Sequence, residues 1–447
     1  MSVSRHSVPP NSRKPHQGHQ AHLTVFAMEY KRQPPATAAA VKVKPRLIIH
    51  GGAGNIKPSN LAPPEYEAYR RALLTIIGKT NAYQTTPLAS TARLPSALDT
   101  AAHAVALLED NPLFNSGHGA VFTRDGINEL EASVMVSRGR KKRGVGVTGL
   151  RHGHTLLHGE TAETLARQYG LALVDAGYFF TQRRWDEHVR ALERERKGQG
   201  LSTWSADEFL PQGTVGAVAL DEDGVVCAAT STGGLTNKLT GRIGDTPVVG
   251  AGFWAEEWVE DGDPTGAFGG GGGENGLVVL SDALRGLMAD CLPSLRTYAP
   301  LPTGLGPPTT RTTTTTTTRA IAVSGTGNGD SFMRVAAGRT VGAVARWKPL
   351  SGAEAVSFVS GPGGELQKSA GGRWGVTGEG EGGVIGVEVA VARDAAGRVV
   401  GARSAVLQDF NCNGMYRAWV GDDGRAYAKI YRGGVEGVGV GELCEKW

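Results

Sequence analysis

The stretch that decides the fold is PQGTVGAVALDEDGVV, residues 211–226. Two apolar runs on either side of the turn sequence DEDG predict a β-hairpin, with one strand at 215–220 and the next at 225–230. The first strand is preceded by Gly213-Thr214, a flexible residue joined to a β-branched hydroxyl residue. Because threonine begins many strands, this stretch alone favours a purely structural role for Thr214.

Strands and helices are predicted on both sides of this hairpin. A short buried strand that runs into a glycine-rich loop is predicted at 46–55, and further strand pairs at 382–404 and 415–431. Helices are predicted within 63–79, 96–110, 160–170 and 183–198. The segment 319–347 is predicted to form a strand, a glycine loop and then a further helix. Paired strands with short turns, together with helices, predict an α+β fold in which antiparallel sheets are covered by helices.

Two regions do not fit this pattern. Residues 1–45 are rich in Ser, Pro, His and Lys and are predicted to form a disordered basic arm, which leaves 46–447 as a single domain. Residues 257–319 include five successive glycines and seven successive threonines. Such low complexity predicts an inserted, mostly disordered surface loop.

Charge, the length of apolar segments and cysteine usage argue against several classes of protein. The net charge is +4, but residues 1–45 carry +6 and the rest carries −2, so the body is not basic and a nucleic-acid partner is not expected. No segment reaches transmembrane length, and the N-terminus lacks the apolar run of a signal peptide. The four cysteines show no CxxC pairing, which argues against a disulfide framework or a zinc site. We therefore expect a cytoplasmic protein without membrane contact, although the basic arm leaves a mitochondrial presequence open.

Three hydroxyl residues flanked by glycine lie in GT (213–214), STGG (231–234) and SGTGNGD (324–330). A threonine hydroxyl needs a base before it can act as a nucleophile. Cutting the chain before Thr214 would supply one, since the new α-amino group has an ordinary pKa of about 8 and is tethered to the hydroxyl. Gly213 permits the strained backbone that attack on its own carbonyl requires.

Arg242 and Asp245, in GRIGD (241–245), have two interpretations. They form a turn ion pair of little energetic value, or they hold the two charges of an amino acid, with Arg242 binding the α-carboxylate and Asp245 the α-ammonium. The GTGNG loop also has two: a weak phosphate cradle that lacks the Walker lysine, or an oxyanion site made by Thr326 and the Gly327 N–H.

Taken together, these segments resemble the plant-type asparaginase / isoaspartyl peptidase family of N-terminal-nucleophile (Ntn) hydrolases. The resemblance covers roughly two thirds of the chain and rests on IIHGGAG (48–54), LFNSGHGAVFTRDGINELEASVM (113–135), the segment 213–245 and SGTGNGD (324–330). It implies a four-layer αββα sandwich made as an inactive precursor. Cleavage between Gly213 and Thr214 would leave an α piece, 1–213, and a β piece, 214–447.

The resemblance also implies the roles of individual residues. Thr214 would be the nucleophile and, through its freed amine, the base. Thr232 would orient it, and Thr326 with Gly327 would form the oxyanion hole. The remaining roles fall to the substrate clamp (Arg242 and Asp245), a residue lining the site (Asn115) and the loop needed for self-cleavage (His50–Gly54).

The implied reaction is hydrolysis of the side-chain amide of L-asparagine or of the β-linked bond of an isoaspartyl peptide. Arg242 and Asp245 hold what these substrates share, so the sequence does not rank them. No cofactor is required, and the resemblance implies a structural sodium ion held by backbone carbonyls near 106–114. The expected partners are a small-molecule or short-peptide substrate and a second αβ unit, giving a dimer of αβ heterodimers.

The chain departs from the family pattern in two places. Only RHG (151–153) joins two segments between which the family usually has a helix, and Asp330 stands where it more often has Glu. Other functions therefore stay open: a glycosylasparaginase, whose usual signal peptide and disulfides are missing here; a taspase-like endopeptidase that uses the long insertion; and an inactive scaffold that retains the fold.

Overall fold

The computed structural model describes residues 41–138, 144–145, 155–208, 210, 213–261, 315–348, 350–433 and 438–439. The predicted basic arm up to residue 40 and the short RHG connection lie outside the described residues. The described part mixes helices with antiparallel strands, as the hairpin pattern predicts.

The larger sheet has eight strands in the order β12-β11-β10-β1-β4-β5-β2-β3. The opening hairpin is confirmed as β4 and β5, and it lies in the middle of this sheet, paired through β4 to β1. The strands are β1 (Arg46–Gly54), β2 (Glu131–Val136), β3 (Gly144–Val145), β4 (Val215–Leu220), β5 (Val226–Thr232), β10 (Gly414–Val420), β11 (Arg425–Lys429) and β12 (Val438–Gly439).

The second sheet has four longer strands in the order β6-β7-β8-β9. Its strands are β6 (Phe253–Asp261), β7 (Thr316–Gly327), β8 (Gly382–Arg393) and β9 (Val399–Phe410). Every residue of β8 except the last is buried, so this strand lies inside the molecule with both of its faces covered.

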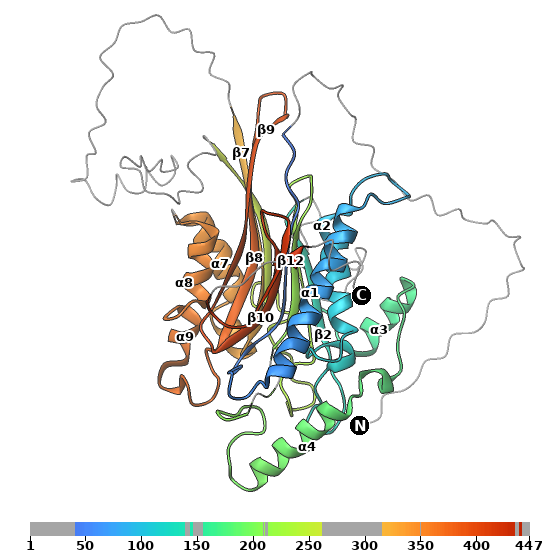
Figure 1. The fold of residues 1–447 in the computed structure, drawn as a ribbon, viewed down its shortest axis with the longest axis vertical. Helices are drawn as coiled ribbons and strands as arrows, with labels where there is room; N and C mark the ends of the chain where they lie inside the picture. Colours follow the sequence, from blue (N-terminus) through green and yellow to red (C-terminus); the bar gives the residue numbers. More distant parts are fainter. Residues whose placement is uncertain are drawn as a thin grey trace, which may run out of the picture. The chain divides into compact units, whose positions relative to one another are not determined.

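Helices cover the outer faces of the two sheets (Figure 1). Ser96 caps the second helix as predicted, with its hydroxyl accepting the Asp99 N–H. The helices are α1 (Pro63–Thr85), α2 (Ala97–Glu109), α3 (Gly159–Gln168), α4 (Gln182–Arg196), α6 (Gly329–Arg334), α7 (Ala337–Trp347), α8 (Gly352–Ser360) and α9 (Glu365–Ala370). Residues 117–119, 176–179 and 371–373 form short 3-10 turns.

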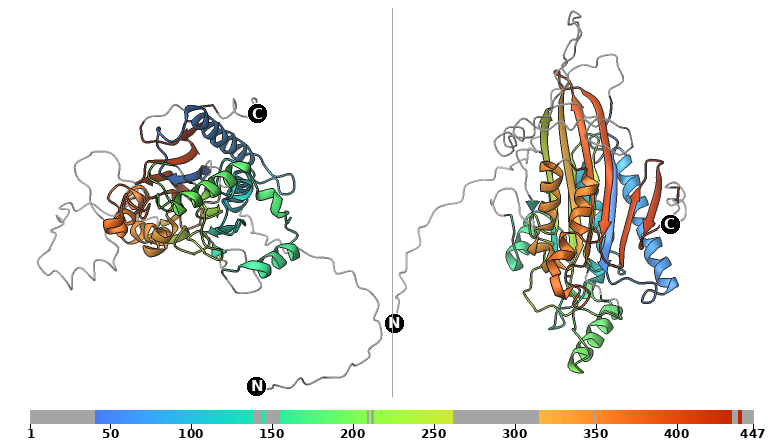
Figure 2. Two further views of the ribbon diagram at one scale, coloured as in Figure 1. Left: turned by 90° about the horizontal axis from the view of Figure 1, so that it is seen from below. Right: turned by 90° about the vertical axis from the view of Figure 1, so that its left-hand side faces the viewer.

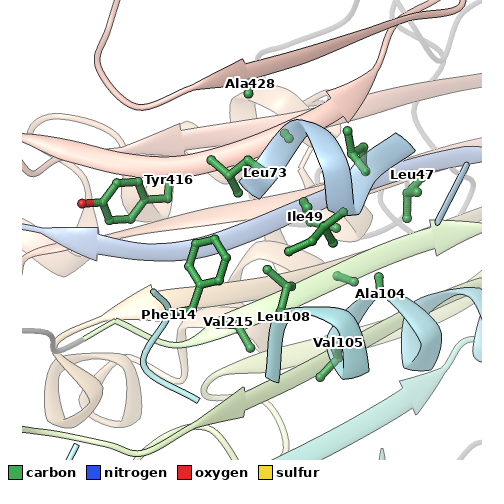
Figure 3. Close-up of a cluster of buried hydrophobic side chains, with 14 of the residues drawn as sticks. Leu47, Ile49, Leu73, Ala104, Val105, Leu108, Phe114, Val215, Tyr416 and Ala428 are labelled. Atoms are coloured by element: carbon green, nitrogen blue, oxygen red, sulfur yellow. The ribbon is translucent and has the colours of Figure 1, made fainter. Parts of the chain in front are cut away.

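Three hydrophobic clusters hold these elements together. The first joins α1 and α2 to the larger sheet through residues such as Leu73, Leu108 and Ile49 (Figure 3). The second lies between the two sheets, and the third joins the four-stranded sheet to α7 and α8, which lie across its face (Figure 2). Burial of apolar area, at about 25 cal/mol per Å² removed from water, is the main force that fixes this arrangement.

The ends of the predicted loop 257–319 are wrong. Residues 257–261 belong to β6 and residues 316–319 to β7, where Trp258 pairs with Arg319 and Glu260 with Thr317. Threonine and other β-branched residues favour strands, so the end of the threonine run extends β7 instead of the loop. The glycines of SGTG, which were predicted to form a loop, also lie in β7. The helices α8 and α9 have no counterpart among the predicted helices. Residues 262–314 lie outside the described residues.

Candidate active site

Thr214 is buried at the N-terminal end of β4, in the centre of the larger sheet. Its backbone N–H donates a hydrogen bond of 2.8 Å to the hydroxyl of Thr326, on β7 of the facing sheet. The chain is continuous from Gly213 to Thr214, so this nitrogen is a peptide amide and stands for the amine that cleavage would release. The two sheets thus bring Thr326 to Thr214 from 112 residues away.

The carbonyl oxygen of Gly213 accepts hydrogen bonds from two predicted site residues. Asn115 Nδ2 donates at 3.1 Å and Thr232 Oγ1 at 3.4 Å. Asn115 is fixed in turn, because its Oδ1 accepts the Val121 N–H and its Nδ2 also donates to Gly234 O. Two polar donors on a single carbonyl draw electron density toward its oxygen and make its carbon more electrophilic.

Gly213 has to be a glycine for a packing reason. A Cβ at this position would meet the backbone of Gly52, whose φ of +126° is itself in a region that favours glycine. The glycine-rich end of β1 therefore presses directly against the Gly213–Thr214 bond. This contact puts the HGGAG loop (50–54) against the bond that the resemblance expects to be cleaved.

Thr246 also contacts the Thr214 hydroxyl and was missed by the sequence analysis. Its Oγ1 lies 3.2 Å from Thr214 Oγ1, and its carbonyl accepts hydrogen bonds from Ser133 Oγ at 2.6 Å and Thr230 Oγ1 at 3.3 Å. Its one sequence signal was its position directly after Asp245 in GRIGDT.

A second missed pair is formed by His50 and Ser324, which bridge the two sheets. His50 Nε2 lies 2.7 Å from Ser324 Oγ, and the space for this contact exists because Gly216 has no side chain: a Cβ there would meet both atoms. Burial lowers the pKa of His50 to about 3, an effect only partly offset by the Thr214 backbone. His50 is therefore a neutral imidazole at physiological pH.

The predicted clamp residues lie close together, but they are not joined in the way a simple turn ion pair requires. Arg242 Nη2 pairs with Asp330 Oδ1 at 2.8 Å, while Asp245 is buried nearby. Burial, followed by the charge of Glu131, raises the pKa of Asp245 to about 7, and the nearby Arg242 partly counters the rise. A Cβ on Gly329 would meet Asp245 Oδ1 and come within 3.2 Å of Arg242 Nη2, so this glycine keeps the space between the two groups clear.

The sequence of this chain also matches a known protein family. The family model described as asparaginase matches residues 43–267, half of the chain. The chain belongs to the asparaginase family. The match ends before β7, so the place of Thr326 beside Thr214 rests on the structure alone, and Gly327 is the next residue along β7.

Curated relatives of this asparaginase-family chain include isoaspartyl peptidases and plant-type L-asparaginases. An isoaspartyl peptidase of Salmonella typhimurium is 40% identical over 222 residues, which cover 47% of this chain and 69% of the relative. The isoaspartyl peptidase of Escherichia coli is 41% identical, with 47% and 67% covered. A plant-type L-asparaginase of Pyrococcus furiosus is 36% identical over 231 residues, covering 47% and 70%.

The asparaginase-family site also bears on the phosphate interpretation of GTGNG. Thr326 and Gly327 end β7, and Gly327 has a φ of +142°. Asn328 caps the following helix α6 by accepting the Ser331 N–H, and Asp330 places a negative charge in its first turn. A capped, acidic helix start is a poor phosphate site.

Within the described residues, no group of three or more His, Cys, Asp or Glu side chains is arranged to hold a metal ion. Among the helices of the same part of the chain, none is long and apolar enough to cross a membrane.

Proposed function

We propose that the protein is a self-activating amidohydrolase that cleaves the side-chain amide of L-asparagine and β-aspartyl peptide bonds through Thr214. The names of the relatives, isoaspartyl peptidase and plant-type L-asparaginase, supply the reaction class. The observation that carries the proposal is the convergence of Asn115 and Thr232 on the Gly213 carbonyl, whose carbon is bonded to the Thr214 nitrogen.

Self-cleavage follows from these contacts. Thr214 Oγ attacks the Gly213 carbonyl carbon and forms a C–O bond, while Asn115 and Thr232 stabilise the negative charge that develops on the oxygen. The Gly213–Thr214 C–N bond then breaks, and the hydroxyl proton ends on the Thr214 nitrogen. Water hydrolyses the ester that results, leaving a Gly213 carboxylate and Thr214 with a free amine and hydroxyl.

Substrate hydrolysis reuses the same atoms. The free amine takes the proton of Thr214 Oγ, which attacks the side-chain carbonyl of the substrate. Ammonia or an amino acid leaves with that proton, and water releases aspartate from the β-aspartyl ester. Thr326 and Gly327 bind the oxyanion, and Thr232 and Thr246 hold the nucleophile in one orientation.

The clamp of Arg242 and Asp245 holds the two charged groups on the substrate's α-carbon. Arg242 binds the α-carboxylate, in exchange for part of its contact with the exposed Asp330. Asp245 binds the α-ammonium, and this positive charge favours the ionised form of a carboxyl whose pKa burial has raised. Both substrates present these two groups, so one clamp serves both.

We further propose a structural sodium ion in the loop 106–114. A Cβ on Gly117 would meet the carbonyl oxygen of Glu109, and one on Gly119 would meet those of Pro112 and Phe114, so three backbone carbonyl oxygens lie close against these two glycines. Neutral oxygens of this kind suit a hard cation. Thermal unfolding in sodium chloride and in choline chloride tests this: a higher midpoint in sodium supports the ion, and equal midpoints contradict it.

The same proposal covers the fold and the assembly. Two stacked sheets with α1 and α2 outside one and α7 and α8 outside the other support the four-layer αββα sandwich of Ntn hydrolases. The mature form is an α piece, 1–213, bound to a β piece, 214–447, and two such units form the dimer. Size-exclusion chromatography with light scattering measures this directly.

The deciding experiment is intact mass with N-terminal sequencing of purified protein, followed by three substrate assays. We expect a chain that begins at Thr214, ammonia from L-asparagine and free aspartate from an isoaspartyl dipeptide. An intact chain after long incubation, with no release from either substrate, would instead favour the inactive scaffold. Cleavage of a folded protein after aspartate, with neither small substrate turned over, would favour the endopeptidase.

A further inference from the structure

A cavity of about 330 Å³ lies at the edge of the space between the two sheets, between β9 and the strands β10 and β11. None of its lining residues takes part in the site around Thr214. They are Gln408, Asp409, Phe410, Arg417, Trp419, Lys429, Arg432 and Gly433.

Two cations of this cavity face each other directly. Arg417 on β10 and Lys429 on β11 are register partners in adjacent antiparallel strands, so their side chains leave the sheet on the same face. Like charges in directly opposed positions destabilise a sheet. Arg432, just beyond β11, adds a third cation to the same cavity.

The hydrogen bonds of Arg417 do not neutralise its charge. Its side chain is buried, and it donates to the amide oxygen of Gln408 and to the carbonyls of Met415, Ile430 and Tyr431. All four acceptors are neutral. A buried charge without an opposite charge is costly, so this environment favours an added anion.

One carboxylate lines the cavity, and it pairs with the third cation, Arg432. Asp409 Oδ1 pairs with Arg432 Nη2 at 2.8 Å, and within the described residues Lys429 forms no ion pair. Burial, then the charge of Arg432, lowers the pKa of Arg417 to about 10. Burial and the charges of Arg417 and Arg432 likewise lower the pKa of Lys429. Among the described lining residues, three cations and one carboxylate leave an excess of two positive charges.

Phe410 holds the two guanidinium groups in place before any ligand arrives. Its ring centroid lies 4.6 Å from the Arg417 guanidinium carbon and 4.4 Å from that of Arg432. Contact with an aromatic face restrains a guanidinium without neutralising it. The cavity therefore combines volume, excess positive charge and restrained donors that suit carboxylate or phosphate oxygens.

We propose that this cavity binds a small dianion, carrying either a phosphate group or two carboxylates, with Arg417, Lys429 and Arg432 as its cationic groups. The ligand supplies the two negative charges that the cavity lacks. This site is separate from the clamp of Arg242 and Asp245, so the proposal does not rest on the enzymatic activity.

The test is titration calorimetry of the full-length protein with inorganic phosphate and with succinate, at constant ionic strength set by sodium chloride. We expect saturable binding of at least one of them with a Kd of about 1 mM or tighter. Lys429→Gln and Arg432→Gln each remove one partly exposed cation and should weaken binding by about tenfold, as expected for one charge-assisted hydrogen bond. The phosphate and succinate arms identify which dianion the cavity prefers.

Two controls make the result specific. Lys368→Gln removes an exposed lysine that pairs with Glu365 on α9, and binding should not change. Arg242→Gln disables the clamp, and binding should persist in it, which separates this cavity from the proposed active site. Absence of saturable binding by both anions, or equal binding by Lys429→Gln and the unaltered protein, would overturn the proposal.

Discussion

One row of residues across the larger sheet joins two very different environments. Its members are paired in register from strand to strand and all face the second sheet: Ser133, Thr230, Gly216, His50, Arg417 and Lys429. At one end, Ser133 and Thr230 are neutral hydroxyls that hydrogen-bond each other and Thr246. At the other end, Arg417 and Lys429 are cations without an opposite charge of their own among the described residues.

The contrast shows two ways of burying polar groups on the same sheet. A closed network of neutral hydrogen bonds fixes geometry and needs nothing from solution, which suits a nucleophile that must be held in one position. An open group of like charges stays costly until an anion arrives, which suits a binding site. His50, neutral and bonded to Ser324, separates the two environments.

The largest expected effect comes from removing the proposed nucleophile. Thr214→Ala should leave the chain uncut and lower amidase activity by a factor on the order of 10⁶, the loss that removing a nucleophile causes in other hydrolases. Denaturing electrophoresis and ammonia release measure the two effects. Full activity of Thr214→Ala would contradict the assignment of the site.

A change that alters only packing at the same bond should act next most strongly. Gly213→Ala places a Cβ against the Gly52 backbone, so the scissile carbonyl shifts away from Asn115 and Thr232. A misplacement of about 1 Å costs on the order of 10²-fold in rate. The matched control is Gly177→Ala, since nothing lies within 4 Å of a Cβ at that position. Electrophoresis over time measures the self-cleavage rates. Equal rates for the two variants would show that the contact is irrelevant.

The pH profile should report the buried carboxyl of the clamp. In the proposed clamp, Asp245 binds the substrate ammonium only when ionised, and its pKa is about 7, so its protonation should lower kcat/KM below that value, in addition to the loss caused by protonation of the Thr214 amine. Asp245→Asn should raise KM by about 10²-fold and make the acidic limb less steep, leaving the contribution of the amine. Asp330→Asn, which changes an exposed partner of Arg242, should alter KM by less than about fivefold. A profile for Asp245→Asn identical to that of the unaltered enzyme would rule out this role.

Within the hydroxyl network, the contribution of Thr246 should be modest. Thr246→Val deletes the hydroxyl that lies 3.2 Å from Thr214 Oγ1, so kcat should fall about fivefold to tenfold while KM stays the same. Thr246→Ser retains the hydroxyl and should restore the rate. If Thr246→Ser is as slow as Thr246→Val, the methyl group matters instead of the hydrogen bond.

At the cationic end, the effect on catalysis should be the smallest. Lys429→Gln removes a charge that has no part in the chemistry at Thr214, so hydrolysis of L-asparagine without added anions should be unchanged. Steady-state kinetics in a buffer free of phosphate and carboxylates measure this. A loss of activity there would mean that the two ends of the row are coupled.

The parts of this picture that were predictable from sequence are local or carried by motifs. The hairpin 211–226 and the Ser96 cap follow from short patterns, and the family resemblance points to Asn115 and Thr232 as site residues, although not to their contacts with the Gly213 carbonyl. Thr246 and Ser324 were missed, because their contacts depend on how two sheets stack and leave no periodic trace in the chain. The ends of the 257–319 loop were misplaced because composition does not reveal that β6 and β7 extend into it and pair there.

The strand order of the larger sheet has a consequence for the matured protein. Strands β1, β2 and β3 precede Gly213, whereas β4, β5, β10, β11 and β12 follow it, and the two groups alternate across the sheet. The pairs β10–β1, β1–β4 and β5–β2 would therefore each join one piece to the other after cleavage. Maturation would turn a unimolecular folding equilibrium into a bimolecular one. The unfolding midpoint of the cut form should rise with protein concentration by mass action, while that of the uncut chain should not.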